Sequence, residues 1–315
     1  MTRKLHIAAA QLGAAQLSDS RDTLVARLRD LLAQAHSRGV RFVVFPELAL
    51  TTFFPRYWFD NQVEADERFY ERAMPSPVTA PLFDDAKRCG IGFYLGYAEL
   101  SEEGGRMRRF NTAILVSPQG EIVGKYRKVH LPGHAEHKPH AAFQHLEKKY
   151  FEVGDLGFRT WRIQDTIMGM LICNDRRWPE AFRALTLQGA ELVALGFNTP
   201  TENLHYPEPP ALRVHHHLIM AQAMAFMNAT WLVETAKCGF EDGFRMFGHS
   251  VIVAPSGEIV AKTVGEGDEL ISFDADLDLA QDLKRTMFNY AAHRRPEHYR
   301  ILIDRVGAEV TPQNG

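Results

Sequence analysis

Residues 167–180 read IMGMLICNDRRWPE, and this stretch decides how the rest of the chain is interpreted. The apolar run 167–172 stops abruptly at Cys173 and is followed by the polar residues 174–177. A short apolar run that ends in this way is typical of a buried strand that delivers a nucleophile to the edge of a sheet. Most buried cysteines are structural, but the polar exit makes Cys173 a candidate nucleophile.

Two other apolar runs end in groups that a thiol nucleophile needs. Residues 41–46 lead into Glu47, and residues 121–127 lead into Lys128. Glu47 can take the thiol proton as a general base, and we expect the Lys128 ammonium to lower the thiol pKa and to hold the oxyanion. Because the carboxyl ends of strands form the natural crevice of an α/β sheet, these groups should meet Cys173 there.

Each of the two partners also has an ordinary explanation. Alone, Glu47 would cap the turn that follows it, and Lys128 would be a solvated strand end. Side chains alternate along a strand, so Tyr126 shares one face with Lys128, and Lys125 shares the other with Arg127. Only one of these pairs can face the site.

Composition limits the class of protein. The chain has 315 residues, of which 45% are hydrophobic, and its net charge is −3. Such a chain can bury a substantial core, and its scattered basic residues give no reason to expect a nucleic-acid partner. No apolar stretch approaches the roughly 20 residues of a membrane span, and the N-terminal apolar run is interpreted as the first core strand. Three widely spaced cysteines indicate a reducing, cytoplasmic compartment.

Apolar runs of strand length alternate with longer amphipathic stretches, which indicates an α/β layered domain. Strands are expected near 5–11, 41–45, 91–100, 110–116, 121–127, 167–172, 191–195, 230–235, 249–254, 258–263 and 269–274, and helices near 20–38, 78–89, 178–188 and 210–228.

An internal repeat refines this fold. Residues 114–125 are nearly repeated in 251–262, and both copies are typical of hairpins that turn on Pro-x-Gly. Each half of the chain would then add a hairpin to its own sheet, which predicts a four-layer α-β-β-α sandwich. No linker divides it, so we expect one domain over 1–315 with a loose tail at 308–315.

Five tracts carry a family resemblance, and they span nearly the whole chain. Together they resemble the N-carbamoyl-D-amino acid amidohydrolases of the nitrilase superfamily of carbon-nitrogen hydrolases. The tracts are FPELALTTFFPR (45–56), GKYRKVHLPGH (124–134), FQHLEKKYFEVGDLGF (143–158), ICNDRRWPE (172–180) and FGHSVIVAPSGEIVA (247–261).

The resemblance implies a nitrilase-type sandwich and a catalytic Glu47, Lys128 and Cys173. It implies hydrolysis of N-carbamoyl-D-amino acids to the D-amino acid, ammonia and carbon dioxide through a thioester, with a small molecule as substrate and no cofactor or metal. A homo-oligomer, dimer or tetramer, is also implied.

Further site residues follow from the same resemblance. Glu147 would orient the lysine and the substrate nitrogen, although the sequence fits an exposed acid equally well, and the backbone N–H of Asn174 would help hold the oxyanion. Arg176 and Arg177 indicate a carboxylate on the substrate, and the resemblance favours Arg176 most directly. Adjacent residues of a regular strand point oppositely, so at most one would bind it unless the segment is an irregular turn. The remaining candidates for the pocket are His130, His145, Asn198 and Thr199.

A zinc hydrolase is the main rival chemistry. His134, His137 and His140 are evenly spaced, and 215–217 are three consecutive histidines. Neither group has the HExxH geometry of a zinc site. We therefore interpret residues 130–145 as a mobile lid or pocket wall and 215–217 as the exposed start of a long helix.

The sequence also fits two further classes of protein. Another amidase of the superfamily, such as a β-ureidopropionase-like enzyme or an aliphatic amidase, would use the same Glu, Lys and Cys. A non-catalytic binding protein would keep the fold but would have no need of them. The remaining thiols do not affect this choice, because Cys89 and Cys238 lack the setting of Cys173 and we interpret both as structural.

Overall fold

Two β-sheets form the centre of the computed structural model, which describes residues 2–141, 143–202 and 208–308. The first sheet has the order β6-β5-β4-β2-β1-β14, and the second runs β7-β8-β9-β10-β12-β13. They join where β1 pairs with β10 at Leu12 and Gly13. The strands of the first sheet are β1 (Lys4–Gly13), β2 (Phe42–Val44), β4 (Gly92–Glu103), β5 (Arg106–Val116), β6 (Ile122–Arg127) and β14 (Glu269–Asp276), with β3 (Tyr70–Glu71) beside β4.

The second sheet contains the strand that ends at Cys173. Its parallel strands β8, β9 and β10 are near-continuous apolar runs, as expected of strands covered on both faces. The strands are β7 (Thr160–Ile163), β8 (Thr166–Ile172), β9 (Leu192–Phe197), β10 (Trp231–Glu241), β12 (Val251–Val253) and β13 (Ile259–Lys262), with β11 (Phe244–Phe247) on the far end of β10.

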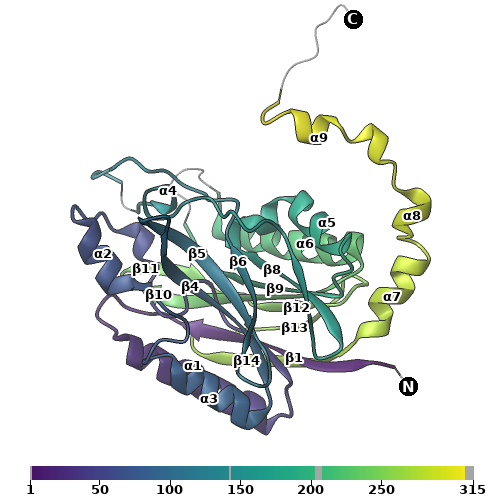
Figure 1. Cartoon of the computed structure of the whole chain (residues 1–315), viewed down its shortest axis with the longest axis horizontal. Helices are drawn as coiled ribbons and strands as arrows, with labels where there is room; N and C mark the ends of the chain where they lie inside the picture. The colour runs from purple at the N-terminus through teal and green to yellow at the C-terminus, as the bar shows by residue number, and fades with distance from the viewer. Residues whose placement is uncertain (1, 142, 203–207, 309–315) are drawn as a thin grey trace, which may run out of the picture.

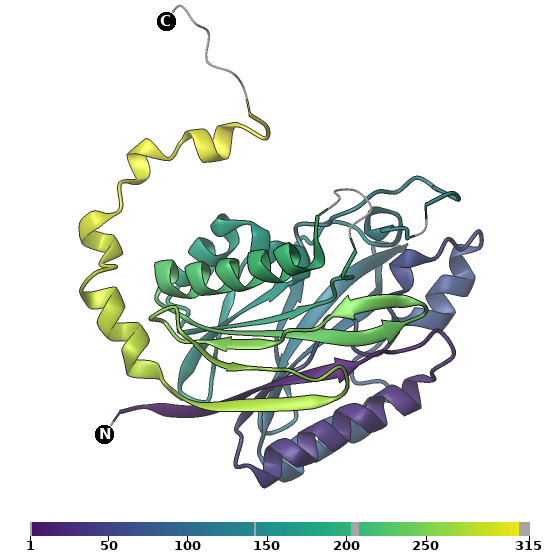
Figure 2. The same cartoon turned by 180° about the vertical axis from the view of Figure 1, so that it is seen from behind.

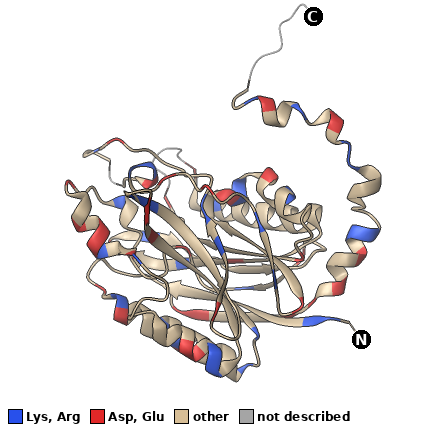
Figure 3. Ribbon diagram, in the orientation of Figure 1, with Lys and Arg blue, Asp and Glu red and all other residues tan. Residues whose placement is uncertain are grey.

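Helices cover the outer faces and complete four layers (Figures 1 and 2). α1 (Arg21–Ser37) and α3 (Ala80–Cys89) pack on the first sheet, and α5 (Pro179–Thr186) and α6 (Pro210–Asn228) pack on the second. Acidic and basic residues are interspersed on α1 and α3 (Figure 3), and Arg29 of α1 bonds Asp85 of α3 at 2.6 Å. The predicted α-β-β-α sandwich is confirmed. No helix within the described residues is long and apolar enough to cross a membrane.

The repeated hairpins are also confirmed. β5 pairs with β6, and β12 pairs with β13, both antiparallel. Each pair has a register shift at the same place of the repeat, between Leu115 and Val116 in one and between Ile252 and Val253 in the other. The repeated sequence thus produces the same bulged hairpin in each sheet.

Several short elements were not expected from the sequence. β7 and β11 are short edge strands with no clear alternation, and α2 (Gln62–Phe69) and α4 (Glu147–Tyr150) lie in stretches without a long apolar period. Single-turn 3-10 helices occupy η1 (Phe54–Arg56), η2 (Cys173–Arg177) and η3 (Pro296–His298).

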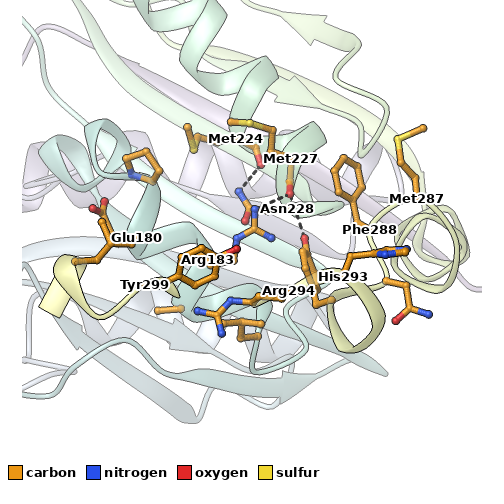
Figure 4. Close-up of a pocket in the computed structure, with 16 residues that line it drawn as sticks. Glu180, Arg183, Met224, Met227, Asn228, Met287, Phe288, His293, Arg294 and Tyr299 are labelled. Carbon is orange, nitrogen blue, oxygen red and sulfur yellow. Dashed lines mark hydrogen bonds between the residues drawn. The ribbon is translucent and has the colours of Figure 1, made fainter. Parts of the chain in front are cut away.

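The C-terminal part of the chain arches away from the sandwich as an arm (Figures 1 and 2). It contains α7 (Leu277–Arg285), α8 (Tyr290–His293) and α9 (Ile301–Asp304). A cavity of about 630 Å³ lies between the arm and helices α5 and α6. Figure 4 shows Arg183 of α5 beside Met227 of α6, whose carbonyl accepts from Arg183 Nη2 at 3.0 Å. Tyr290 Oη of the arm donates to the same carbonyl at 3.1 Å. Apart from residue 308, the expected loose tail at 308–315 lies outside the described residues.

Candidate active site

Three strand ends bring Glu47, Lys128 and Cys173 together. Glu47 follows β2 and Lys128 follows β6 in the first sheet, and Cys173 follows β8 in the second. The site therefore lies between the two sheets, at the ends of these strands. All three side chains are buried. Lys128 Nζ donates to Glu47 Oε1 at 2.8 Å, and both groups interact electrostatically with the Cys173 thiol.

Glu47 is held by donors from two further strands. Its Oε1 also accepts from Asn111 Nδ2 at 2.8 Å, and its Oε2 accepts from the Asn198 N–H at 2.9 Å. Asn198 Nδ2 donates in addition to the Glu47 carbonyl at 2.8 Å. The carboxylate is therefore fixed in orientation before a substrate binds, which is the preorganisation that catalysis requires.

Two glycines allow the strands to close around the backbone of Glu47. A Cβ on Gly96 of β4 would lie 2.8 Å from Glu47 Cα, and a Cβ on Gly196 of β9 would lie 2.4 Å from Glu47 N. Real side chains do not tolerate such distances to backbone atoms. Only glycine at these two positions permits the approach that places the base.

Glu147 joins the site through the lysine. Its Oε2 lies 2.6 Å from Lys128 Nζ, and its Oε1 lies 3.1 Å from His145 Nε2. Burial alone would raise the pKa of Glu147, but Lys128 and then His145 outweigh it and lower the pKa. Burial likewise opposes the charge of Lys128, whereas Glu147 and Glu47 raise its pKa well above the ordinary range. Lys128 is therefore an ammonium throughout the working pH range.

Cys173, the candidate nucleophile, lies on a sharp turn that a buried aspartate holds. Cys173 has φ +44°, in the left-handed region, and begins η2. Asp175 Oδ2 accepts from Tyr126 Oη at 2.8 Å and from the Ile172 N–H at 3.0 Å. Its Oδ1 lies 2.8 Å from His130 Nδ1 and accepts the His130 N–H at 3.1 Å. Asp175 thus ties the turn to the end of β6.

Burial and Glu47 outweigh the effect of Lys128 on the pKa of the Cys173 thiol. Burial first and the Glu47 carboxylate second raise the pKa of Cys173 to about 11, against the smaller opposing effect of Lys128. Lys128 lowers the thiol pKa as predicted, but burial and Glu47 together raise it by more. Cys173 therefore rests as a thiol, and a reaction at its sulfur would require a base beside it, a position that Glu47 occupies.

A cavity of about 380 Å³ opens beside the thiol. Its described lining includes six residues of the predicted site, Cys173, Asn174, Arg177, Asn198, Thr199 and His145. The expected pocket wall contributes Pro132, Gly133, His134, Lys138 and Phe143. Pro200 and Glu202, which follow β9, and Arg213 of α6 complete the lining.

Arg176 and Arg177, the two arginines that follow Cys173, lie in different surroundings. Residues 173–177 form a 3-10 helix rather than a strand, which is the irregular turn left open by the sequence. Arg177 lies on the cavity wall and donates to Asn174 Oδ1 at 3.0 Å. Arg176 is buried behind it, where Nη2 donates to Thr199 Oγ1 at 2.9 Å and the guanidinium lies over the Phe197 ring. Arg177, not Arg176, therefore faces the cavity beside Cys173.

The histidines are distributed among several structural contacts. His130 stacks on Trp178 at 4.9 Å and holds Asp175, and it is not among the lining of the cavity at Cys173. His137 stacks on Trp58 at 4.4 Å. Within the described residues, no group of three or more His, Cys, Asp or Glu is arranged to hold a metal ion.

The expectation that 215–217 are all exposed is wrong for one member. His215 and His216 are exposed, but His217 is only 1% exposed. Its Nδ1 lies 3.1 Å from Glu234 and its Nε2 lies 2.9 Å from the His249 carbonyl. Successive residues of a helix point in different directions, so one of three can face the core.

Comparison with known proteins identifies the family. Residues 6–285 match the carbon-nitrogen hydrolase family. The chain belongs to this family. It is accordingly a hydrolase of non-peptide carbon–nitrogen bonds, an amidase of the nitrilase superfamily.

Individual relatives cover nearly all of the chain. It is 29% identical over 299 residues to the N-carbamoylputrescine amidase of Arabidopsis thaliana, covering 91% of this chain and 92% of the relative. The carbon-nitrogen hydrolase of Helicobacter pylori G27 has the same fold, with a TM-score of 0.79, 23% identity and coverage of 96% and 99%. An amidase from Nesterenkonia sp. follows with a TM-score of 0.70, 24% identity and coverage of 95% and 96%.

Proposed function

We propose that this amidase hydrolyses N-carbamoyl-D-amino acids to the D-amino acid, ammonia and carbon dioxide, without a cofactor. One observation carries the choice of substrate. The cavity beside Cys173 is lined by the cations Arg177, Arg213 and Lys138, whereas Glu202 is the one acid among its described lining residues. Such a wall suits a substrate with a carboxylate close to the reacting carbonyl.

The first half of the reaction forms a covalent intermediate. Glu47 takes the proton of Cys173 while the sulfur attacks the ureido carbonyl carbon. The carbonyl oxygen becomes an oxyanion that Lys128 and the backbone N–H of Asn174 stabilise, and the loss of one such donor typically costs about 3 kcal/mol. The positive φ of Cys173 turns its side chain out of the strand, toward the cavity it lines.

The second half releases the products. The protonated Glu47 gives its proton to the departing nitrogen, the carbon–nitrogen bond breaks and a thioester remains. A water molecule that Glu47 deprotonates then attacks the thioester carbon, and Glu47 returns this proton to the Cys173 sulfur as the carbon–sulfur bond breaks. The carbamic acid that is released loses carbon dioxide and leaves the second nitrogen product. Mass spectrometry of the trapped adduct identifies the order, because a bare carbamoyl increment means that the amino acid departed first.

A second candidate substrate is suggested by the relatives. Several of them are named N-carbamoylputrescine amidase. That substrate ends in a primary amine, which is a cation at neutral pH. The cations Arg177, Arg213 and Lys138 would repel it, so the cavity favours the amino acid derivative.

Release of ammonia, which every substrate of the panel yields on hydrolysis, tests the proposal. Matched N-carbamoyl-D- and L-amino acids, with phenylglycine and methionine side chains, are compared with N-carbamoylputrescine and a simple aliphatic amide. We expect D-selective turnover that persists with a chelator and disappears in Cys173→Ala. Equal turnover of the simple amide, or a preference for N-carbamoylputrescine, would contradict the substrate, and sensitivity to the chelator would contradict the mechanism.

We also propose that the protein is a homo-oligomer. The arm exposes the apolar side chains of Leu302, Ile303 and Val306, and the fractional exposure of Ile303 is 79%. Exposed apolar residues so closely spaced mark a surface that another protein covers. A second copy of the chain is the partner we infer.

A further inference from the structure

Behind the active-site cavity lies a second, smaller chamber of about 60 Å³. Thr199, Arg177 and Arg213 line both spaces, so the chamber adjoins the active-site cavity at these three residues. Arg176 lines only the chamber. No sequence motif singles out Arg213, which lies in the first turn of α6.

The two deeper arginines have hydrogen-bonding capacity left over. Arg176 is 1% exposed, and its Nε and Nη1 are buried without a hydrogen-bond partner among the described residues. Arg213 is 8% exposed, and its Nη1 is also buried without a partner in the described part of the chain. Native structures satisfy nearly all buried polar groups, so several unpaired guanidinium N–H groups at one chamber indicate a missing acceptor.

The charged side chains around the chamber are also unbalanced, with more positive than negative charge among the described residues. Glu208 lies 3.4 Å from Arg213 Nε and shares its carboxylate with His216, 3.2 Å away. Burial lowers the pKa of Arg213, and repulsion from Arg176 lowers it further, against the opposing effect of Glu208. The intervening residues 203–207 read NLHYP and bring no acidic side chain. Among the described residues that line the chamber, Glu208 is the one carboxylate beside the two buried guanidiniums of Arg176 and Arg213. An uncompensated buried charge is costly unless an anion joins it.

The chamber has a size that suits only a small anion. A water molecule occupies about 30 Å³ in the liquid, so a chamber twice that size accepts a carboxylate group but no aromatic ring. Arg177 stands on the cavity wall nearer to Cys173, where the α-carboxylate of an N-carbamoyl amino acid would lie. The unpaired N–H groups of Arg176 and Arg213 then remain for a second acid.

We propose that the physiological substrate carries a second carboxylate on a short side chain, as in N-carbamoyl-aspartate or N-carbamoyl-glutamate, and that Arg213 selects it. This inference rests on the proposed function and narrows its substrate class. Arg213 acts in specificity, because it binds the side chain rather than the reacting atoms. The neutral isosteres, the asparagine and glutamine derivatives, have one acceptor oxygen instead of two and no charge, and their NH₂ group would face guanidinium N–H groups that it cannot pair with.

Steady-state kinetics with paired substrates test the inference. We expect wild-type kcat/KM for the D-aspartate derivative to exceed that for the D-asparagine derivative by on the order of 10- to 100-fold, the range for a charged hydrogen bond. In Arg213→Met this ratio falls to about one, chiefly through KM, whereas Arg213→Lys keeps an intermediate ratio. The matched control is Arg162→Met, which removes an exposed arginine on β7 and should keep the wild-type ratio.

Two results would overturn the inference while the proposed function stands. One is a wild-type enzyme that hydrolyses the asparagine derivative as well as the aspartate derivative. The other is an Arg213→Met protein in which both substrates lose the same factor, since Arg213 would then not distinguish them. If no N-carbamoyl amino acid is hydrolysed by the folded wild type, the proposed function fails and the inference fails with it.

A binding measurement protects the test against a variant that does not fold. Calorimetry of Cys173→Ala, with all its arginines in place, compares the aspartate and asparagine derivatives directly. Tighter binding of the aspartate derivative by on the order of 10-fold or more supports the inference. Equal binding of the two overturns it.

Discussion

Glu47 receives its hydrogen bonds from donors fixed on three separate strands or strand ends. Asn111 lies within β5, Lys128 follows β6 and Asn198 follows β9. None of these donors can move without disturbing a sheet, so the carboxylate keeps one orientation toward Cys173. A base placed in this way can accept the thiol proton although the thiol itself is a weak acid.

The raised pKa of Cys173 has a consequence for stability. A folded-state pKa of about 11, against an ordinary value of 9.0, means that the folded protein keeps the thiol proton over a range in which the unfolded chain has lost it. The contribution of the Cys173 thiol to the free energy of unfolding is therefore fully present below pH 9, and it is lost as the pH rises to about 11. We expect the wild type to lose about 3 kcal/mol of unfolding free energy across this range relative to Cys173→Ala.

Urea unfolding of both proteins at several pH values measures this difference. Burial also raises the pKa of Cys238, to about 12, but that thiol titrates in both proteins and cancels. Parallel pH profiles for wild type and Cys173→Ala would show that the thiol pKa is not raised.

Replacement of the base should separate thiol acidity from turnover. In Glu47→Gln the carboxylate that raises the Cys173 pKa is gone, so the pKa should fall below about 11 while burial keeps it above the ordinary value. Hydrolysis should nevertheless fall by about 10²- to 10⁴-fold, because the general base is lost. Ultraviolet absorbance of the thiolate, titrated beside steady-state kinetics, gives both quantities. An unchanged thiol pKa would mean that Glu47 and Cys173 are not coupled.

At the scale of the elements, the approach of β4 and β9 to the Glu47 turn is the critical packing. An alanine at Gly196 would place its Cβ 2.4 Å from Glu47 N and 2.6 Å from Pro46 C. Both are backbone atoms that cannot rotate aside, so the strands must separate. We expect Gly196→Ala to cost about 1–3 kcal/mol of stability and to lower kcat more than it raises KM.

Gly267→Ala is the matched control, because nothing lies within 4 Å of its added Cβ. Thermal unfolding and kinetics of the two variants separate packing from a general effect of alanine. Equal kcat in both variants would show that Gly196 does not position the base.

The elements with a strong local pattern could be predicted from sequence. The apolar run before Cys173 became β8, the Pro-x-Gly repeats became hairpins, and alternation correctly separated Lys128 from Lys125 and Arg127, which both bond Glu99. These features depend on the spacing of apolar residues, on the residues that form turns and on residues adjacent in the sequence. They needed no knowledge of distant contacts.

The missed site residues depend on long-range packing. Asn111 is a polar residue within β5, and only the pairing of β5 with its neighbours brings it to Glu47. Arg213 is similar, because it reaches the cavity through the placement of α6. Gly96 and Gly196 did carry a signal, since a lone glycine in a strand often marks a close backbone approach. Asp175 lies within the quoted CNDRR tract, but its four hydrogen bonds join it to three residues, of which Tyr126 and His130 lie on a distant segment of the chain.

At the scale of the whole molecule, the arm is the part with the least packing against the sandwich. Its apolar residues Leu302, Ile303 and Val306 stay exposed, although the chain folds back over α5 and α6 around a cavity. A single copy thus leaves apolar surface in water that association would bury. We expect the double variant Ile303→Asp, Val306→Asp to shift the protein from oligomer to a smaller species.

Size-exclusion chromatography with light scattering measures the shift. Val264→Asp is the control, since Val264 is 87% exposed on a different part of the surface and should leave the mass unchanged. A wild type that is already monomeric would contradict the proposed assembly.

The origin of the site's parts has an evolutionary consequence. Glu47, Lys128 and Cys173 come from the rigid ends of strands, whereas the cavity wall beyond them comes from residues 130–145, the 3-10 turn and the first turn of α6. Mutations can therefore change the residues of the cavity wall while Glu47, Lys128 and Cys173 keep their relative positions. Proteins with this architecture can therefore evolve new substrate specificities while they keep the same reaction. Relatives that are named for different amide substrates are what this separation predicts.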